Sequence, residues 1–153
     1  MNVSDLLENG EYMKCKVSNS SELFNHINND LRHFNYVSER FLSEIIKRED
    51  QYPTGIETSS MGIALPHVDA EYVNKNALII CSLDPSIPFF RMDDINKEIE
   101  VKIAFILLIK DPHMHVDTIS KLTQIWQKKE LLDQIYNASS KTEIIMALKK
   151  EGV

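Results

Sequence analysis

Seven consecutive apolar residues, Ile103 to Ile109, are the feature of this sequence that most constrains its fold. Successive side chains of a strand point to opposite faces of a sheet, so a strand that is apolar at every position has to be covered on both faces. The run is far too short for a membrane-spanning helix, which needs about 20 apolar residues. We therefore predict a central strand over residues 101–110, buried between two layers.

Shorter patterns predict the elements around this strand. Apolar segments that are typical of strands occupy residues 13–17, 62–65 and 77–83. Apolar residues recur at helical spacing in residues 20–31, 34–47, 116–126, 131–135 and 142–149. Residues 48–60 contain the turn signal Pro53-Thr54-Gly55 and are expected to be irregular. Helices at both ends and strands between them predict an α/β fold, a three-layer sandwich in which a mixed β-sheet is flanked by helices on both faces.

Length and composition exclude several classes of protein. With 153 residues, the chain has the usual size of one domain, which we place at residues 1–153. Its formal net charge of −6 argues against non-specific nucleic-acid binding, which needs a basic surface. The chain has only four glycines, and they form no Gly-rich phosphate loop of the P-loop or dinucleotide type. No cationic region followed by an apolar stretch opens the sequence, so we expect a cytoplasmic protein without a signal peptide.

Histidines are the best candidates for chemistry. His67 follows a predicted strand and Pro66, so that a rigid corner would present its side chain. His113 and His115 lie where a helix is expected to begin, and a helix N-terminus offers free amide donors to a phosphoryl group. On spacing alone, a structural loop histidine at 67 and solvated cap residues at 113 and 115 are the favoured interpretations.

Two stretches of sequence carry a resemblance to a known family. One contains Arg48-Glu49 followed by Pro53-Thr54-Gly55, and the other is Gly62-Ile63-Ala64-Leu65-Pro66-His67. Together they resemble the phosphorylation region of enzyme IIA domains in the fructose/mannitol superfamily of sugar phosphotransferase systems. The resemblance covers about residues 5 to 150 and implies a single type 2 enzyme IIA domain. The stretch from Tyr52 to Glu57 is most similar to galactitol-type members.

This resemblance implies a role for each matching residue. His67 would accept the phosphoryl group, His115 would donate a hydrogen bond to it, and Arg48 would supply a cation. His113 replaces His115 if the helix is matched in another register. Thr54 would add a hydroxyl for phosphoryl binding. The resemblance implies no cofactor and no metal.

The same resemblance implies the partners. Phosphorylated HPr would be the donor and a cysteine of a separate enzyme IIB the acceptor, with the membrane reached only through an enzyme IIC. Apolar residues around the site would form the docking surface, and its candidates are the exposed members of Ile63, Leu65, Phe89 and Phe90, each of which is expected in the core more often than at a contact. The sequence does not identify the sugar, because IIA domains do not normally contact it.

Three other interpretations compete with a transport role. A nitrogen-regulatory IIA paralogue would share the histidine but control other proteins. A zinc site would combine His67, His113 and His115 with Asp111 or Asp117, although the chain has neither an HxxxH motif nor a cysteine cluster. A structural or interaction domain without phosphorylation is the last.

Overall fold

The central apolar run lies in the middle strand of a mixed sheet, as predicted. In the computed structural model, which describes residues 1–153, this strand is β5 (Glu98–Leu108). It pairs antiparallel with β4 (Ala77–Phe90) and parallel with β3 (Gly62–Ala64). β1 (Glu11–Cys15) and β2 (Gly55–Glu57) form the two edges, so that the five strands are ordered β1-β4-β5-β3-β2.

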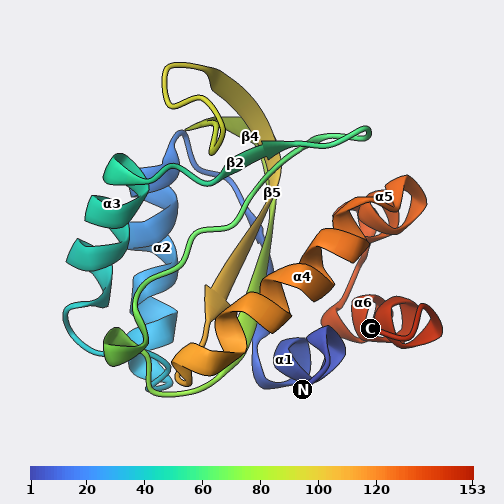
Figure 1. Cartoon of the computed structure of the whole chain (residues 1–153), viewed down its shortest axis with the longest axis horizontal. Helices are drawn as coiled ribbons and strands as arrows, with labels where there is room; N and C mark the ends of the chain where they lie inside the picture. Colours follow the sequence, from blue (N-terminus) through green and yellow to red (C-terminus); the bar gives the residue numbers. More distant parts are fainter.

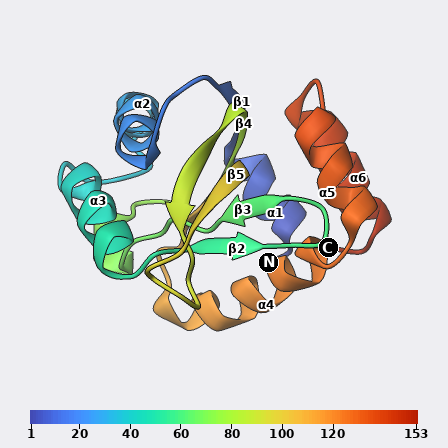
Figure 2. The ribbon, with the colours of Figure 1, turned by 90° about the horizontal axis from the view of Figure 1, so that it is seen from above.

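Helices cover both faces of this sheet, which confirms the three-layer α/β sandwich (Figures 1 and 2). One face is covered by α2 (Ser20–His33) and α3 (Phe41–Gln51). The other face is covered by α1 (Val3–Asn9), α4 (His115–Trp126), α5 (Lys129–Asn137) and α6 (Lys141–Lys150). Two short 3-10 helices, η1 (Ala70–Tyr72) and η2 (Pro112–Met114), lie in the connections. None of the helices has the length and apolarity to cross a membrane.

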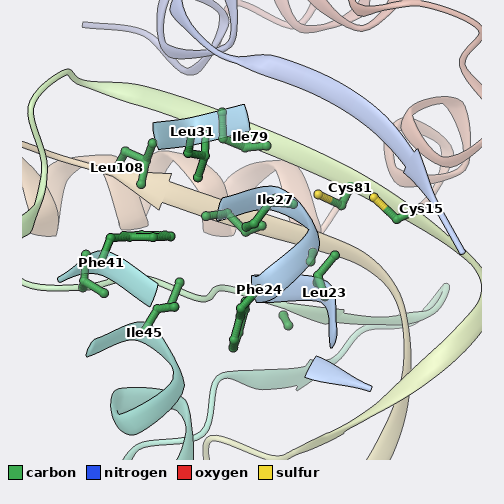
Figure 3. Packing of buried hydrophobic residues seen from close by; sticks show 14 of the residues in the cluster. Cys15, Leu23, Phe24, Ile27, Leu31, Phe41, Ile45, Ile79, Cys81 and Leu108 are labelled. Carbon is green, nitrogen blue, oxygen red and sulfur yellow. The ribbon is translucent and has the colours of Figure 1, made fainter. Parts of the chain in front are cut away.

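Two hydrophobic cores result, one on each side of the sheet. Consecutive residues of β4 contribute to different cores, with Leu78 on the side of α4 and Ile79 on the side of α2. Figure 3 shows the core on the side of α2, to which Phe24 of α2 and Phe41 of α3 contribute. This division explains why the central strand can be apolar without interruption.

The helix predicted over residues 34–47 is wrong at both ends. Asn35 has a positive φ of 59°, and the Tyr36 N–H returns to the carbonyl oxygen of Leu31 (2.8 Å), which ends α2. Asparagine tolerates this left-handed conformation better than most residues. The next helix begins only at Phe41 and continues through Arg48, so that Arg48 lies in its last turn instead of in an irregular segment.

Two other elements differ from the prediction. β4 does not end at Leu83 but continues to Phe90, with an irregularity between Ser82 and Ile87. The pairing of β4 with β1 ends at Leu83. Pro88 lacks an N–H on the edge of β4 that faced β1, so no hydrogen bond between strands is lost there. Helix α1 was not predicted, although Val3, Leu6 and Leu7 of this helix have helical spacing and are all buried.

Candidate active site

The backbone around His67 is held from both sides. Within β5, Leu107 donates its N–H to the carbonyl oxygen of Pro66 (3.1 Å) and pairs with His67 in a parallel bridge. On the other side, the Leu65 N–H lies 3.2 Å from Oγ1 and 3.3 Å from the carbonyl oxygen of Thr54. Pro66 adds a fixed φ, so His67 lies on a rigid corner.

A backbone carbonyl selects the tautomer of the His67 ring. Its Nδ1 lies 2.7 Å from the carbonyl oxygen of Leu65, which can only accept a hydrogen bond. Nδ1 therefore carries the hydrogen, and Nε2 of the neutral ring carries the lone pair. Burial lowers the pKa of His67, and the nearby charges of Arg48 and His115 lower it too, although the Leu65 carbonyl and Asp69 act in the opposite direction. The neutral, nucleophilic form is thus favoured.

His115 is the second imidazole of the site. It is the first residue of α4, and its ring centroid lies 6.1 Å from that of His67, with the rings inclined at 74°. Burial, followed by the charge of Arg48, lowers its pKa. Its Nε2 is buried and has no hydrogen-bond partner in the chain. His113 lies in η2 and is exposed, so the structure brings His115 and not His113 to His67.

Arg48 supplies the positive charge of this cluster. Its Nη1 lies 3.1 Å from Oδ1 of Asp69, and its guanidinium carbon is 5.8 Å from the centre of the Tyr52 ring. Its Nε is buried without a hydrogen-bond partner in the chain. A groove of about 210 Å³ opens beside this group, between α3 and the segment that follows His67. Three residues that are far apart in sequence, Arg48, His67 and His115, thus form one site.

Thr54 does not offer its hydroxyl to this site. The residue is only 4% exposed, and its hydroxyl donates its one hydrogen to Oε1 of Glu49 (2.8 Å). The hydroxyl oxygen of Thr54 also accepts the N–H of Leu65 (3.2 Å). A hydroxyl has a single hydrogen to donate, so Thr54 has none left for a phosphoryl oxygen. In this structure Thr54 therefore has a structural position between Glu49 and Leu65, and its expected phosphoryl contact stays a prediction.

Glu49 is the residue that sequence reasoning passed over. Its carboxylate is buried, and Oε2 accepts the N–H of Thr54 (2.7 Å) while Oε1 accepts the Thr54 hydroxyl. A signal existed in the sequence, because Glu49 follows the buried residues Phe41 and Ile45 at intervals of four, on the buried face of α3. A carboxylate in such a stripe needs a partner inside the protein.

No metal site accompanies these residues. The structure contains no group of three or more His, Cys, Asp or Glu side chains placed to hold a metal ion. Zinc needs three or four such ligands. The zinc alternative therefore lacks a ligand set, because His113 is not part of the cluster around His67.

A comparison with known proteins decides the family. Residues 9–151 match the model of the family described as phosphoenolpyruvate-dependent sugar phosphotransferase system, EIIA 2. The chain belongs to this family. It is therefore an EIIA domain, a phosphotransferase component of the sugar phosphotransferase system and a phosphocarrier for sugar uptake.

Relatives of this EIIA domain include both transport and regulatory proteins. The galactitol-specific EIIA component of Escherichia coli K12 is 24% identical over 115 residues, which are 75% of this chain and 76% of the relative. Enzyme IIA-Mtl of Escherichia coli, solved in complex with phosphorylated enzyme IIB-Mtl, has a TM-score of 0.71 at 19% identity, with 92% and 94% of the chains covered. The nitrogen regulatory protein IIA-Ntr of Neisseria meningitidis has a TM-score of 0.67 at 19% identity, covering 95% and 98%.

The exposed apolar surface of the EIIA domain contains few of the candidate contact residues. Ile63, Leu65 and Phe89 are buried in the core, and only Phe90 of the four candidates is substantially exposed. Val116, next to His115, is 82% exposed although its spacing predicts a buried position, and Tyr52 beside Arg48 is 66% exposed. Exposed side chains with apolar surface therefore lie next to His115 and next to Arg48.

Proposed function

We propose that this EIIA domain takes a phosphoryl group from phosphorylated HPr onto Nε2 of His67 and passes it to a cysteine of an enzyme IIB. One observation carries this proposal, the 2.7 Å contact between His67 Nδ1 and the Leu65 carbonyl oxygen, which leaves Nε2 as the nucleophilic atom. A cation at Arg48 and the imidazole of His115 accompany that atom. These are the groups that phosphoryl transfer needs around its acceptor.

Each transfer step exchanges one bond to phosphorus for another. In the first step, the Nε2 lone pair of His67 attacks the phosphorus of the phosphohistidine donor, and the N–P bond of the donor breaks with its electron pair returning to the donor imidazole. In the second step, the enzyme IIB thiolate attacks the phosphorus, and the electron pair of the breaking bond returns to Nε2. Neither step moves a proton through the acceptor ring, so Nδ1–H can stay bonded to Leu65 throughout.

Arg48 and His115 stabilise the transferring group in this scheme. Charge spreads over the equatorial oxygens of the phosphoryl group during transfer, and preorganised donors stabilise it. The Nε atom of Arg48 and Nε2 of His115 are both buried and unpaired within the chain, so no group of the protein already uses them. Each donor contributes about 2.7–4 kcal/mol, by analogy with oxyanion-hole deletions. Thr54 holds the backbone of Leu65 instead, and the scheme requires no nucleotide or metal.

The relatives support a proposal for the partners and the substrate class. The galactitol-specific EIIA component is similar over 115 residues, and the Tyr52–Glu57 stretch points the same way, which supports uptake of galactitol or a similar sugar alcohol. We place the docking surface for both partners at Val116 and Tyr52, because exposed apolar area near the reactive atom suits a short-lived encounter. The single type 2 domain at residues 1–153 would act in the cytoplasm and reach the membrane through an enzyme IIC.

Phosphorylation in a reconstituted system tests this function. The protein is incubated with phosphoenolpyruvate, enzyme I and HPr, and the modified residue is mapped by mass spectrometry at alkaline pH. We expect one phosphoryl group per chain, on His67, and none on the His67→Gln variant. His113→Gln is the matched control, because that side chain is exposed and stands outside the cluster, and it should be labelled like the wild type.

Label on any other residue, or label on His67→Gln, would overturn the assignment. Addition of a galactitol-type enzyme IIB then separates transport from regulation. Transfer of the label to its cysteine supports the transport role, and a phosphorylated protein that passes nothing on supports the regulatory alternative.

A further inference from the structure

Glu49 is a buried carboxylate that the scheme above does not use. Only 9% of the residue is exposed, at the C-terminal end of α3, and an isolated charge at such a place is costly. Both of its oxygens are bonded to one residue, with the Thr54 N–H at 2.7 Å and the Thr54 hydroxyl at 2.8 Å. The carboxylate thus fixes the backbone and the side chain of Thr54 at the same time.

These bonds continue without interruption to the reactive ring. Thr54 accepts the Leu65 N–H on its hydroxyl oxygen (3.2 Å) and on its carbonyl oxygen (3.3 Å). The carbonyl oxygen of Leu65 then lies 2.7 Å from Nδ1 of His67. Four residues that belong to three different segments therefore form one chain of hydrogen bonds, from the Glu49 carboxylate to the imidazole.

We propose that Glu49 is a positioning residue, which holds the His67 ring in its Nδ1-protonated tautomer through Thr54 and Leu65. The reason is geometric, since a shift of Thr54 moves the Leu65 carbonyl that selects the tautomer. Loss of that selection places a hydrogen on Nε2 in part of the molecules, and such molecules cannot accept a phosphoryl group there. The catalytic consequence rests on the proposed function, whereas the effect on the tautomer does not.

The ionised form of Glu49 is the one that fits this position. Two donors, the N–H and the hydroxyl of Thr54, point at its two oxygens, and a carboxylate accepts both. A carboxamide of the same shape would present its oxygen to one of these donors and its N–H₂ group to the other. If the N–H₂ group faces the hydroxyl, the hydroxyl has to accept instead of donate, and its own hydrogen loses its acceptor. The Glu49→Gln substitution therefore reverses or breaks one of the two bonds while it preserves the volume of the side chain.

Several charges surround Glu49. Burial raises its pKa to about 7, against the hydrogen bonds from Thr54 and the charge of Arg48, which lower it. Lys47 and Asp50 of the same helix and Glu98 of β5 line the groove on which Glu49 borders. The ionised share of Glu49 therefore falls as the pH drops through about 7, and the hold on Thr54 weakens in the same direction.

Nitrogen NMR of the unphosphorylated protein tests the proposal directly. The ¹⁵N shifts of the His67 ring report which nitrogen carries the hydrogen, and they are measured at pH 8 for wild type and Glu49→Gln. We expect the Nδ1–H tautomer to dominate in the wild type and to lose its dominance in Glu49→Gln. The labelling rate by phosphorylated HPr should fall by up to about 100-fold, the usual cost of an acceptor misplaced by about 1 Å.

Two further comparisons keep the test decisive. Asp50→Asn makes the same chemical change one residue later, at an exposed side chain, and should leave tautomer and rate unchanged. Thr54→Ser keeps the hydroxyl and should behave like the wild type, whereas Thr54→Val removes it and should behave like Glu49→Gln. This pair gives an answer even where Glu49→Gln does not fold.

The possible outcomes separate this inference from the proposed function. An unchanged His67 tautomer in both Glu49→Gln and Thr54→Val overturns the positioning role, whatever the labelling rates are. A changed tautomer supports it, even if the wild type is labelled elsewhere and the proposed function fails.

Discussion

The strand end that carries His67 and the helix start that carries His115 present the same side chain in two different ways. The two rings lie 6.1 Å apart, and burial lowers the pKa of both. The His67 ring is bonded to the Leu65 carbonyl, and its backbone is fixed by Thr54 and Leu107. The His115 ring has a buried Nε2 without a partner in the chain and stands beside the highly exposed Val116.

This difference suits the two imidazoles to the different roles proposed for them. A nucleophile needs a fixed tautomer with a known lone pair, and a bonded ring provides it. A donor to a charge that develops only during transfer needs an unpaired hydrogen, and a ring without an internal partner provides that. Under the proposed function the two histidines are therefore not interchangeable, although their surroundings share the charge of Arg48.

Among substitutions that keep His67, replacement of His115 should slow phosphorylation the most. We expect His115→Gln to slow labelling of His67 by about 10²–10³-fold, the usual cost of a lost donor to transition-state charge. The label should still appear on His67, and the ring of His67 should keep its tautomer in ¹⁵N spectra. Complete loss of labelling, or labelling at the rate of the wild type, would show that the comparison between the two rings is wrong.

Sequence reasoning reached the fold because its strongest signals are local. The apolar run at 103–109 requires two covering layers, and the helical stripes supply them. The rigid corner that carries His67 was also predicted, since it is built by the strand and the proline directly before it. The boundaries around residue 35 were missed because the left-handed turn at Asn35 depends on its backbone and leaves no periodic pattern.

The rest of the site depends on contacts between distant residues. Asp69 pairs with Arg48 across 21 positions and Thr54 contacts Leu65 across 11, and no spacing rule connects such pairs. The Thr54 hydroxyl was assigned to the phosphoryl group because its motif lies near the right place, whereas a buried partner on α3 already uses it. The choice between His113 and His115 likewise needed the start of α4 in space.

A pH titration of the His67 and His115 rings should show a smaller effect than the His115→Gln substitution, and it tests whether both rings are desolvated. An ordinary histidine with a pKa of about 6.5 loses about nine tenths of its neutral form between pH 7.5 and 5.5. Because burial lowers the pKa of His67 and of His115, both should lose less over that range in an NMR titration. A midpoint above 6.5 for His67 would contradict the desolvated site.

The pKa shifts of the two histidines and of Glu49 also determine how the stability of the fold changes with pH. A histidine whose pKa is lowered on folding binds protons less readily when folded, so its contribution is fully present above about pH 6.5 and is lost as the pH falls through the lower, folded value. Glu49 acts in the opposite direction, because its raised pKa costs stability as the pH rises toward about 7.

The smallest effect is expected from Asp69, which lies two residues after His67 and pairs with Arg48 at 3.1 Å. The side chains of the pair are 67% and 36% exposed, and such surface pairs contribute only about 0–1 kcal/mol. Asp69→Asn should therefore change the labelling rate by less than about fivefold, which is the factor that corresponds to 1 kcal/mol. The tautomer of His67 should stay unchanged, since the Leu65 carbonyl and not this carboxylate selects it. If Asp69→Asn instead slowed labelling as much as His115→Gln, the exposed ion pair would be what holds Arg48 and the loop of His67 in place. The distinction between the His67 ring, fixed by the backbone, and the His115 ring, without a partner in the chain, would then have to be abandoned.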